Sequence, residues 1–164
     1  MAIVATDLKY RLSGGASNTD PNAALGGAKS TTDASASIFD DVSSAEAVAG
    51  DVEYRCVYFH NNHGSLTSLG ARIWIQTNTP DSDTDVAIGL GTSAINGTEQ
   101  TVADESTAPA GVTFSSPANF AAGLLLGDIP PGQHKAVWVR RTVNAGAAVY
   151  ADSFTLRTQC DTNP

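Results

Sequence analysis

Residues 51–76, DVEYRCVYFHNNHGSLTSLGARIWIQ, decide the fold that we expect for this chain. In residues 53–60 and 72–76, β-branched and aromatic residues alternate in character with polar ones, which predicts two β-strands. Residues 61–70 between them carry Asn, Gly and Ser, which predicts a surface connection. Nothing in this stretch has the form of a catalytic motif. It therefore indicates the architecture of the protein and not its chemistry.

The rest of the chain continues this pattern of short strands separated by turn signals. Asn96-Gly97 and residues 128–132, DIPPG, predict tight turns. Residues 120–126 fit either a strand or one helical turn. Further strands are expected at 86–90, 99–103, 112–115, 133–143 and 152–160. About seven or eight short strands without a long amphipathic helix predict an all-β fold, an antiparallel β-sandwich of immunoglobulin-like or jelly-roll type.

The first 45 residues differ in composition from the rest of the chain. Residues 14–37 are mainly Gly, Ala, Ser, Thr and Asn, and such a stretch buries too little apolar surface to offset its ordering entropy. We therefore expect an extended N-terminal arm over residues 1–45, lying along a neighbouring subunit, and a β-sandwich domain over residues 46–164. A flexible tail is the alternative. Because most expected strands lie beyond the arm, we expect the sandwich to fold without residues 1–37.

Two short elements are expected at the ends of this arm. Residues 7–13 alternate in character and fit a short strand or an extended segment that pairs with an edge. Residues 43–49 fit one short helical turn, which Gly50 would end.

Seven residues of the arm are candidate assembly contacts. Leu25, Ile38 and Phe39 are isolated apolar anchors in a small, polar strip. Three of the nine basic residues also lie in this segment, and their positive bias suits an acidic surface on another subunit. The full set is Lys9, Tyr10, Arg11, Leu25, Lys29, Ile38 and Phe39.

The charge balance restricts the partners. The chain is 41% hydrophobic and 16% charged, with a formal net charge of −8. This charge disfavours nucleic acid and anionic membranes, because both would repel the chain. No stretch approaches the roughly 20 apolar residues that span a bilayer. Because the opening MAIVATDLKY lacks a basic leader, we expect folding in the cytoplasm, with Cys56 and Cys160 as free buried thiols. A disulfide between them is the alternative.

Three patterns resemble functional sites without completing their chemistry. Residues 81–85, DSDTD, lack the later Gly and Glu of an EF-hand loop, so we expect a solvated acidic turn, with a looser surface calcium site as the alternative. His60, His63 and His134 lack the further ligands of a zinc centre. Residues 89–94, GLGTSA, match a dinucleotide fingerprint, but the Asn-Gly turn just beyond them interrupts the required helix.

No motif of the sequence marks a nucleophile. The adjacent carboxylates Asp40-Asp41 and Asp104-Glu105 would point to opposite faces of a strand, so nothing in the sequence favours the facing pair of a glycosidase. We therefore expect no catalytic residue, no metal and no cofactor, and the chain is expected not to be an enzyme.

Trp74 and Trp138 lie in the middle of expected strands, which is typical of core packing. In the alternative interpretation, Trp74, Trp138 and Tyr150 form an aromatic platform that stacks on host glycans, which would make the chain a carbohydrate-binding module. That function requires exposed, coplanar rings.

Three stretches of the chain resemble virion structural proteins of tailed bacteriophages. They are LSGGASNTDPNAALGGAKS at 12–30, IFDDVSSAEAVAGDVEYRCVYFHN at 38–61 and VWVRRTV at 137–143. The resemblance spans residues 7–158 and includes no catalytic signature. It implies a non-enzymatic subunit with an arm and a sandwich, assembled onto the virion in the host cytoplasm. The implied partners are capsid, tail or neck proteins and further copies of the chain.

The resemblance leaves two positions on the particle open. We expect a capsid decoration or cement subunit first, and a tail, neck or baseplate component as the alternative. The two differ in copy number, because decoration follows the shell lattice and tail parts follow the symmetry of the tail.

Overall fold

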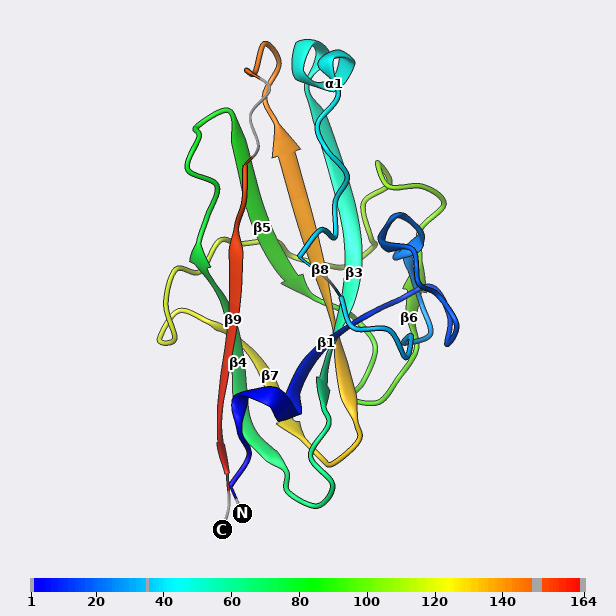
Figure 1. The fold of residues 1–164 in the computed structure, drawn as a ribbon, viewed down its shortest axis with the longest axis vertical. Helices are drawn as coiled ribbons and strands as arrows, with labels where there is room; N and C mark the ends of the chain where they lie inside the picture. Colours follow the sequence, from blue (N-terminus) through cyan, green and yellow to red (C-terminus); the bar gives the residue numbers. More distant parts are fainter. Residues whose placement is uncertain (1, 35, 149–151, 163–164) are drawn as a thin grey trace.

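The computed structural model describes residues 2–34, 36–148 and 152–162. They form an all-β sandwich of antiparallel sheets, as the sequence predicts (Figure 1). The four-stranded sheet has the order β1 (Leu8–Leu12), β3 (Asp51–Asn61), β8 (His134–Val143), β5 (Thr84–Leu90). The three-stranded sheet has the order β7 (Leu124–Ile129), β4 (Ser68–Thr77), β9 (Thr155–Thr162).

The two strands of the 51–76 stretch build opposite walls of the core. β3 belongs to the four-stranded sheet and β4 to the three-stranded sheet, so residues 62–67 cross between them. Val57 and Phe59 of β3 and Ile73 and Ile75 of β4 are buried in one apolar cluster between the sheets. Burying each such side chain stabilises the fold by about 1.5–3 kcal/mol.

A third, smaller layer covers the outer face of the four-stranded sheet. It contains a two-stranded ribbon of β2 (Gly26–Gly27) and β6 (Glu99–Thr101). Beneath it, Cys56, Tyr58 and Trp138 form a second buried cluster. β3 is therefore covered on both faces, which explains why residues 55–61 are all buried and do not alternate with exposed positions.

The first 45 residues fold against the sandwich, which differs from the extended arm expected over 1–45. β1 is an edge strand of the four-stranded sheet, with Leu12 opposite Val57. Further along, Ala24 is buried and its carbonyl accepts the N–H of Cys56 at 2.7 Å. Residues 1–45 and 46–164 are thus not separate bodies within the described chain.

Hydrogen bonds to small residues explain this packing. The Ser13 hydroxyl donates to the Cys56 carbonyl at 2.7 Å and accepts the Gly26 N–H at 3.0 Å. The Ser30 hydroxyl donates to the Asn18 carbonyl at 2.6 Å. Such bonds compensate for the scarcity of apolar side chains, because a satisfied buried polar group avoids a desolvation cost of about 1–3 kcal/mol.

The short helices have clear local causes. In α1 (Ser44–Ala49), Ser43 accepts the Glu46 N–H and Glu46 accepts the Ser43 N–H, a capping box. Gly50 ends the helix at φ 77°, as predicted. Two 3-10 turns, η1 (Ala5–Asp7) and η2 (Pro21–Ala23), lie before β1 and in the loop after it.

Some strand boundaries differ from expectation. Residues 112–115 form only an isolated bridge between Ser115 and Ile88. The undecided segment 120–126 contains a turn and then the start of β7 at Leu124. β9 begins at Thr155, a few residues later than expected, but shows the predicted alternation of half-buried and exposed positions.

The connections between strands define the topology. From β3 onward, each successive strand of the two main sheets crosses to the opposite sheet, with β6 set apart in the outer layer. Immunoglobulin constant domains instead keep pairs of consecutive strands within one sheet. The strand order observed here therefore differs from the immunoglobulin order.

Two glycines provide a test of the outer layer. Gly26 has φ 96°, and a Cβ there would lie 1.8 Å from the Gln100 carbonyl oxygen, whereas Gly15 has φ 108° and open space around it. We expect Gly15→Ala to cost about 1–2 kcal/mol from backbone strain alone. Gly26→Ala should cost about 1–3 kcal/mol more, because the β2–β6 ribbon must shift. Urea unfolding measures both; equal losses would contradict a packed ribbon.

Candidate functional site

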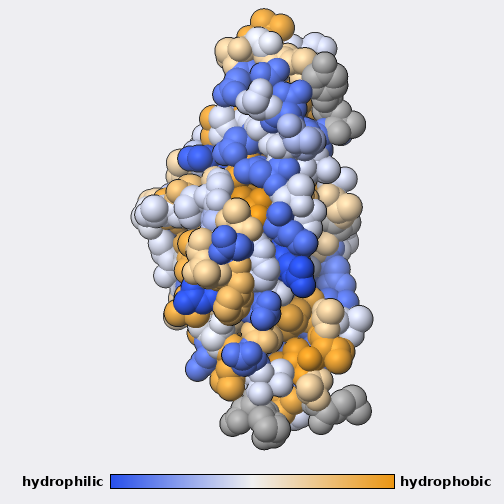
Figure 2. All heavy atoms as spheres, turned by 90° about the vertical axis from the view of Figure 1, so that its left-hand side faces the viewer, coloured by the Kyte–Doolittle hydropathy of each residue, from blue (hydrophilic) through white to orange (hydrophobic). Residues whose placement is uncertain are grey.

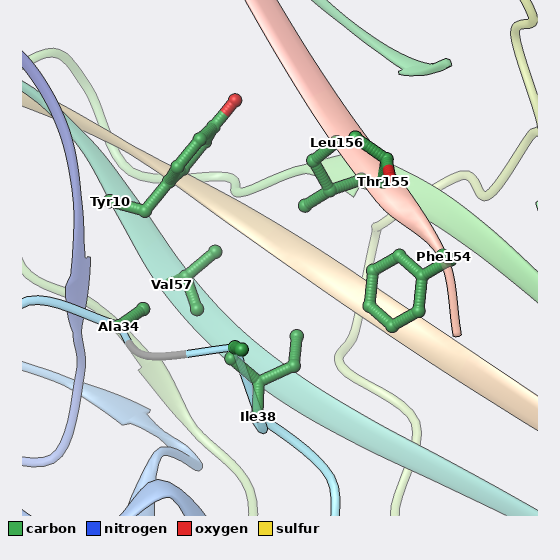
Figure 3. Close-up of a pocket in the computed structure, with 8 residues that line it drawn as sticks. Tyr10, Ala34, Ile38, Val57, Phe154, Thr155 and Leu156 are labelled. Carbon is green, nitrogen blue, oxygen red and sulfur yellow. The ribbon is translucent and has the colours of Figure 1, made fainter. Parts of the chain in front are cut away.

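A groove lies on the side of the sandwich where β1 and β9 face one another, and we call it the side groove. Figure 3 shows Tyr10, Val57 and Ile38 on one side of it and Phe154 and Leu156 on the other. Its apolar part has a volume of about 210 Å³. The lining residues are Tyr10, Ala34, Ala36, Ile38, Val57, Phe154, Thr155 and Leu156.

Tyr10 bridges the sheets beside the apolar part of the groove. Its hydroxyl forms a hydrogen bond with the Thr158 hydroxyl of β9, and its ring packs edge-on against Phe59 at 6.4 Å. Burial raises the pKa of Tyr10 to about 12, although the Thr158 bond opposes the shift. Tyr10 therefore stays neutral and joins the two sheets structurally.

The groove continues into a polar part with a volume of about 330 Å³. Phe39, Asp40 and Arg141 line it, together with Thr84 and Asp152, whose side chains are hydrogen-bonded to one another. The Phe39 ring lies under the Arg141 guanidinium at 4.9 Å and the Arg55 guanidinium at 5.4 Å. Such cation–π contacts hold the ring in place when they are partly buried.

These two arginines belong to a network of ion pairs. Arg55 is fully buried and pairs with Glu105 at 2.5 Å and with Asp40 at 3.8 Å. Arg141 pairs with the buried Glu53 and, at 3.6 Å, with Asp40. Burial raises the pKa of Glu53, and the nearby Arg141 opposes that shift.

The same network accounts for a group of carboxylates with the spacing of metal ligands. Oxygens of Asp40, Glu53 and Glu105 lie within 4.8 Å of one another. The guanidinium groups of Arg55 and Arg141 stand among them and supply the positive charge that a cation would otherwise supply. This arrangement indicates a structural ion-pair network.

The candidate assembly contacts separate into two groups. Tyr10, Ile38 and Phe39 meet in the side groove. Leu25 instead packs in the outer layer against the cluster that contains Trp138.

The basic contacts lie away from the groove. Lys9 and Arg11 pair with Asp33 at 3.4 and 2.8 Å, so part of their charge is matched within the chain. Burial and the neighbouring Arg11 lower the pKa of Lys29. The predicted contact of these residues with an acidic partner stays a prediction.

Two of the three histidines are brought together by the sheet. His60 of β3 lies directly opposite His134 of β8, with ring centroids 6.5 Å apart. His63 points elsewhere, and its Nδ1 accepts the N–H groups of Ser65 and Leu66. Among the described residues, His60 and His134 belong to no group of three possible metal ligands.

His60 should make the protein sensitive to acid. Burial, together with Lys29, Arg11 and His134, lowers its pKa from 6.5 to about 4. Between these values the unfolded chain binds more protons, so the free energy of unfolding falls as the pH drops from about 6.5 to about 4, by up to about 3 kcal/mol. Thermal unfolding of the wild type and His60→Gln from pH 7.5 to 4.5 measures this. Parallel slopes for the two proteins would contradict the assignment.

The tryptophans do not offer a platform. Trp138 is 0% exposed beneath the outer layer, and Trp74 is 6% exposed. Phe120 packs edge-on against Trp74 at 5.9 Å, and the Arg157 guanidinium lies 5.9 Å from its ring. The burial of both residues confirms the expected core packing and contradicts the alternative, a stacking platform at Trp74 and Trp138, because neither presents a free ring face. Tyr150 lies outside the described residues.

The two remaining sequence patterns serve the fold. In the acidic turn, Asp81 accepts the Asp83 N–H at 2.9 Å and Asp83 accepts the Ala148 N–H at 3.1 Å, which are loop-stabilising bonds. Residues 89–94 end β5 and lead into turns, without the helix that a dinucleotide site requires. Of the two free thiols, Cys56 is buried in the outer cluster and Cys160 is half-buried on β9.

Sequence reasoning missed most of the groove. Phe154 and Leu156 belong to the strand expected over residues 152–160, but nothing in the sequence shows that they face Ile38 and Val57. Arg55 and Arg141 gave no signal, because each lies inside an ordinary strand pattern. Residues so far apart in sequence are brought together only by the packing of the two sheets.

Fold and groove together define the class of this protein: an all-β sandwich with a side groove that has an apolar part and a polar part. Comparison of the chain with protein-family models, with curated proteins and with solved structures finds no match. Among the described residues, no helix has the length and apolar character to cross a membrane.

Proposed function

We propose that this chain is a non-enzymatic structural subunit of a tailed-bacteriophage virion, acting as a capsid decoration or cement protein. The side groove carries the proposal. It joins an apolar part, lined from both sheets, to a larger polar part at Asp40 and Arg141. Grooves of this kind receive apolar side chains or an extended segment from a partner, with nearby charges setting the orientation.

Two properties of the chain support this role. The stretches at 12–30 and 38–61 resemble virion structural proteins. The outer layer packs on the four-stranded sheet, and β1 of the N-terminal segment extends that sheet. Both contacts make the sandwich more rigid, which suits a subunit of an assembled particle. Figure 2 shows the face beyond the three-stranded sheet, where hydrophobic patches gather mainly in the lower half and hydrophilic side chains in the upper half.

Filling the groove should prevent assembly without unfolding the subunit. Ala36 is exposed and lines both parts of the groove, whereas Ala121 is exposed in the turn before β7. We expect Ala36→Trp to reduce incorporation into particles at least tenfold, with Ala121→Trp incorporated normally. Both are supplied from a plasmid to a phage that lacks the gene, and circular dichroism checks folding. Normal incorporation of folded Ala36→Trp would contradict the claim that the side groove is the contact used in assembly.

The position on the particle is tested by counting copies. Quantitative mass spectrometry on gradient-purified particles compares this chain with the major capsid protein. A ratio on the scale of the shell protein is the expected result for decoration. A copy number per particle that corresponds to only a few rings of subunits would place the chain in the neck, tail or baseplate instead. Complete absence from the particles would overturn the virion role.

A further inference from the structure

The free edge of β9 is an unused pairing surface. β9 pairs with β4 only, and within the described residues no other backbone hydrogen bond involves positions 155–162. The other outer strands near it are covered: the Tyr10 carbonyl of β1 accepts the Ala34 N–H at 2.7 Å, and Ile88 of β5 exchanges bonds with Ser115. An uncovered edge exposes a row of N–H and C=O groups that can pair with another chain.

β9 is also a regular strand, which an added partner requires. In its pairing with β4, the register shifts place the extra residues on β4, between Leu69 and Arg72 and between Ile75 and Thr77. The opposite edge of this sheet, β7, is different. It carries its own extra residue in the pairing with β4, and Gly127 there has φ 96°. Bulges bend an edge and discourage pairing, so β9 is the better template of the two.

The exposed side chains of β9 complement a second copy of themselves. Arg157, Gln159 and Asp161 all point to the exposed face. Neither Arg157 nor Asp161 has an ion-pair partner among the described residues. In an antiparallel pair centred on Gln159, Arg157 of each copy stands opposite Asp161 of the other. Opposite charges placed directly across two strands stabilise the pair, and like charges destabilise it.

We propose that two copies of this chain associate through β9, antiparallel and with the two-fold axis at Gln159. The three-stranded sheets then join into one continuous sheet of twice the size. Centring the pair on Arg157 or on Asp161 would oppose like charges, and centring it on Thr158 or Cys160 would oppose each charge to a neutral residue. Of these registers, only the one centred on Gln159 places opposite charges across the two strands. The contact is the same on both copies and closes on itself, which gives a dimer and not a fibre. The inference does not depend on the proposed virion role.

A cysteine on the axis tests the register. In Cys160→Ser protein, Gln159→Cys places two thiols directly opposite, with Cβ atoms about 4.5–5.5 Å apart, close to disulfide reach. The matched control is Leu125→Cys on the exposed face of β7, also with Cys160→Ser. Mild oxidation should produce a covalent dimer of the first variant and leave the control monomeric. Equal crosslinking of both, or of neither, would overturn the proposal.

Charge exchange tests the same contact without chemistry at the axis. Sedimentation at about 0.15 M salt, where the Debye length is about 8 Å, measures the dimer constant with the net repulsion screened. Arg157→Asp and Asp161→Arg should each weaken dimerisation at least tenfold, because each creates two like-charge pairs. The double variant should recover it. A wild type that stays monomeric, or a double variant as weak as the singles, would overturn the proposal.

Discussion

Removing residues 1–37 is expected to leave a chain that does not fold. The deletion removes β1, including the buried Leu12, and the segment with Ala24 and Leu25 that covers the outer cluster. Trp138 and Tyr58 would then face water. Each such side chain contributes about 1.5–3 kcal/mol when it is buried. Exposing several of them therefore removes most of the free energy of unfolding of a typical domain, which is roughly 5–15 kcal/mol. Circular dichroism and hydrogen exchange of the truncated chain measure the effect.

A short truncation is the control for this experiment. Removing residues 2–4 leaves β1 complete and takes away Val4, which is 53% exposed. We expect that variant to keep the melting temperature of the full chain within a few degrees. The result reverses what composition alone predicts, since residues 14–37 look like a dispensable arm. A cooperatively folded product lacking residues 1–37 would show that the N-terminal segment is merely laid on the surface.

Val57→Asp should prevent folding at neutral pH. Val57 is 1% exposed on the inner face of β3, where it packs in the main core and forms part of the floor of the side groove. A carboxylate there would be buried without a partner, which costs several kcal/mol. Expression in the soluble fraction and near-ultraviolet circular dichroism measure the loss.

An exposed position on the facing sheet provides the comparison. Gln76→Asp introduces the same charge on β4 at an exposed site and should change the free energy of unfolding by at most about 0.5 kcal/mol. Ile75→Asp, one residue earlier and buried, should behave like Val57→Asp. If Val57→Asp gave a soluble protein with the native spectrum, the assignment of Val57 to the core-facing side of β3 would be wrong.

The sequence predicts elements well where the signal is local. The alternation in 51–76 identified β3 and β4, because side chains of a strand point alternately to its two faces. The helical turn expected over residues 43–49, ended by Gly50, corresponds to α1. The strand expected over residues 152–160 corresponds to β9, whose positions alternate between exposed and half-buried. Each of these inferences uses residues only a few positions apart.

The sequence predicts structure poorly where a segment is ordered by hydrogen bonds to backbone groups far away in the chain. Residues 14–37 have the composition of a mobile tail, yet the Ala24 carbonyl accepts the Cys56 N–H of β3 and the Gly26 N–H donates to the Ser13 hydroxyl. Composition measures the apolar area that a segment can bury and says nothing of the backbone groups elsewhere in the chain with which it can form hydrogen bonds. The same limit applies to Trp138, whose outer face is covered by residues far away in the chain.

The sequence by itself determined that this protein is an all-β sandwich, with its strands and turns close to their observed places, because periodicity and turn chemistry act over a few residues. Only the tertiary structure decided which strands share a sheet and that the N-terminal segment is part of the fold. It also decided that Tyr10, Ile38 and Leu156 enclose a groove and that β9 keeps a free edge. These features depend on pairings between residues about 30 to about 150 positions apart, and such pairings are selected by the whole packed structure.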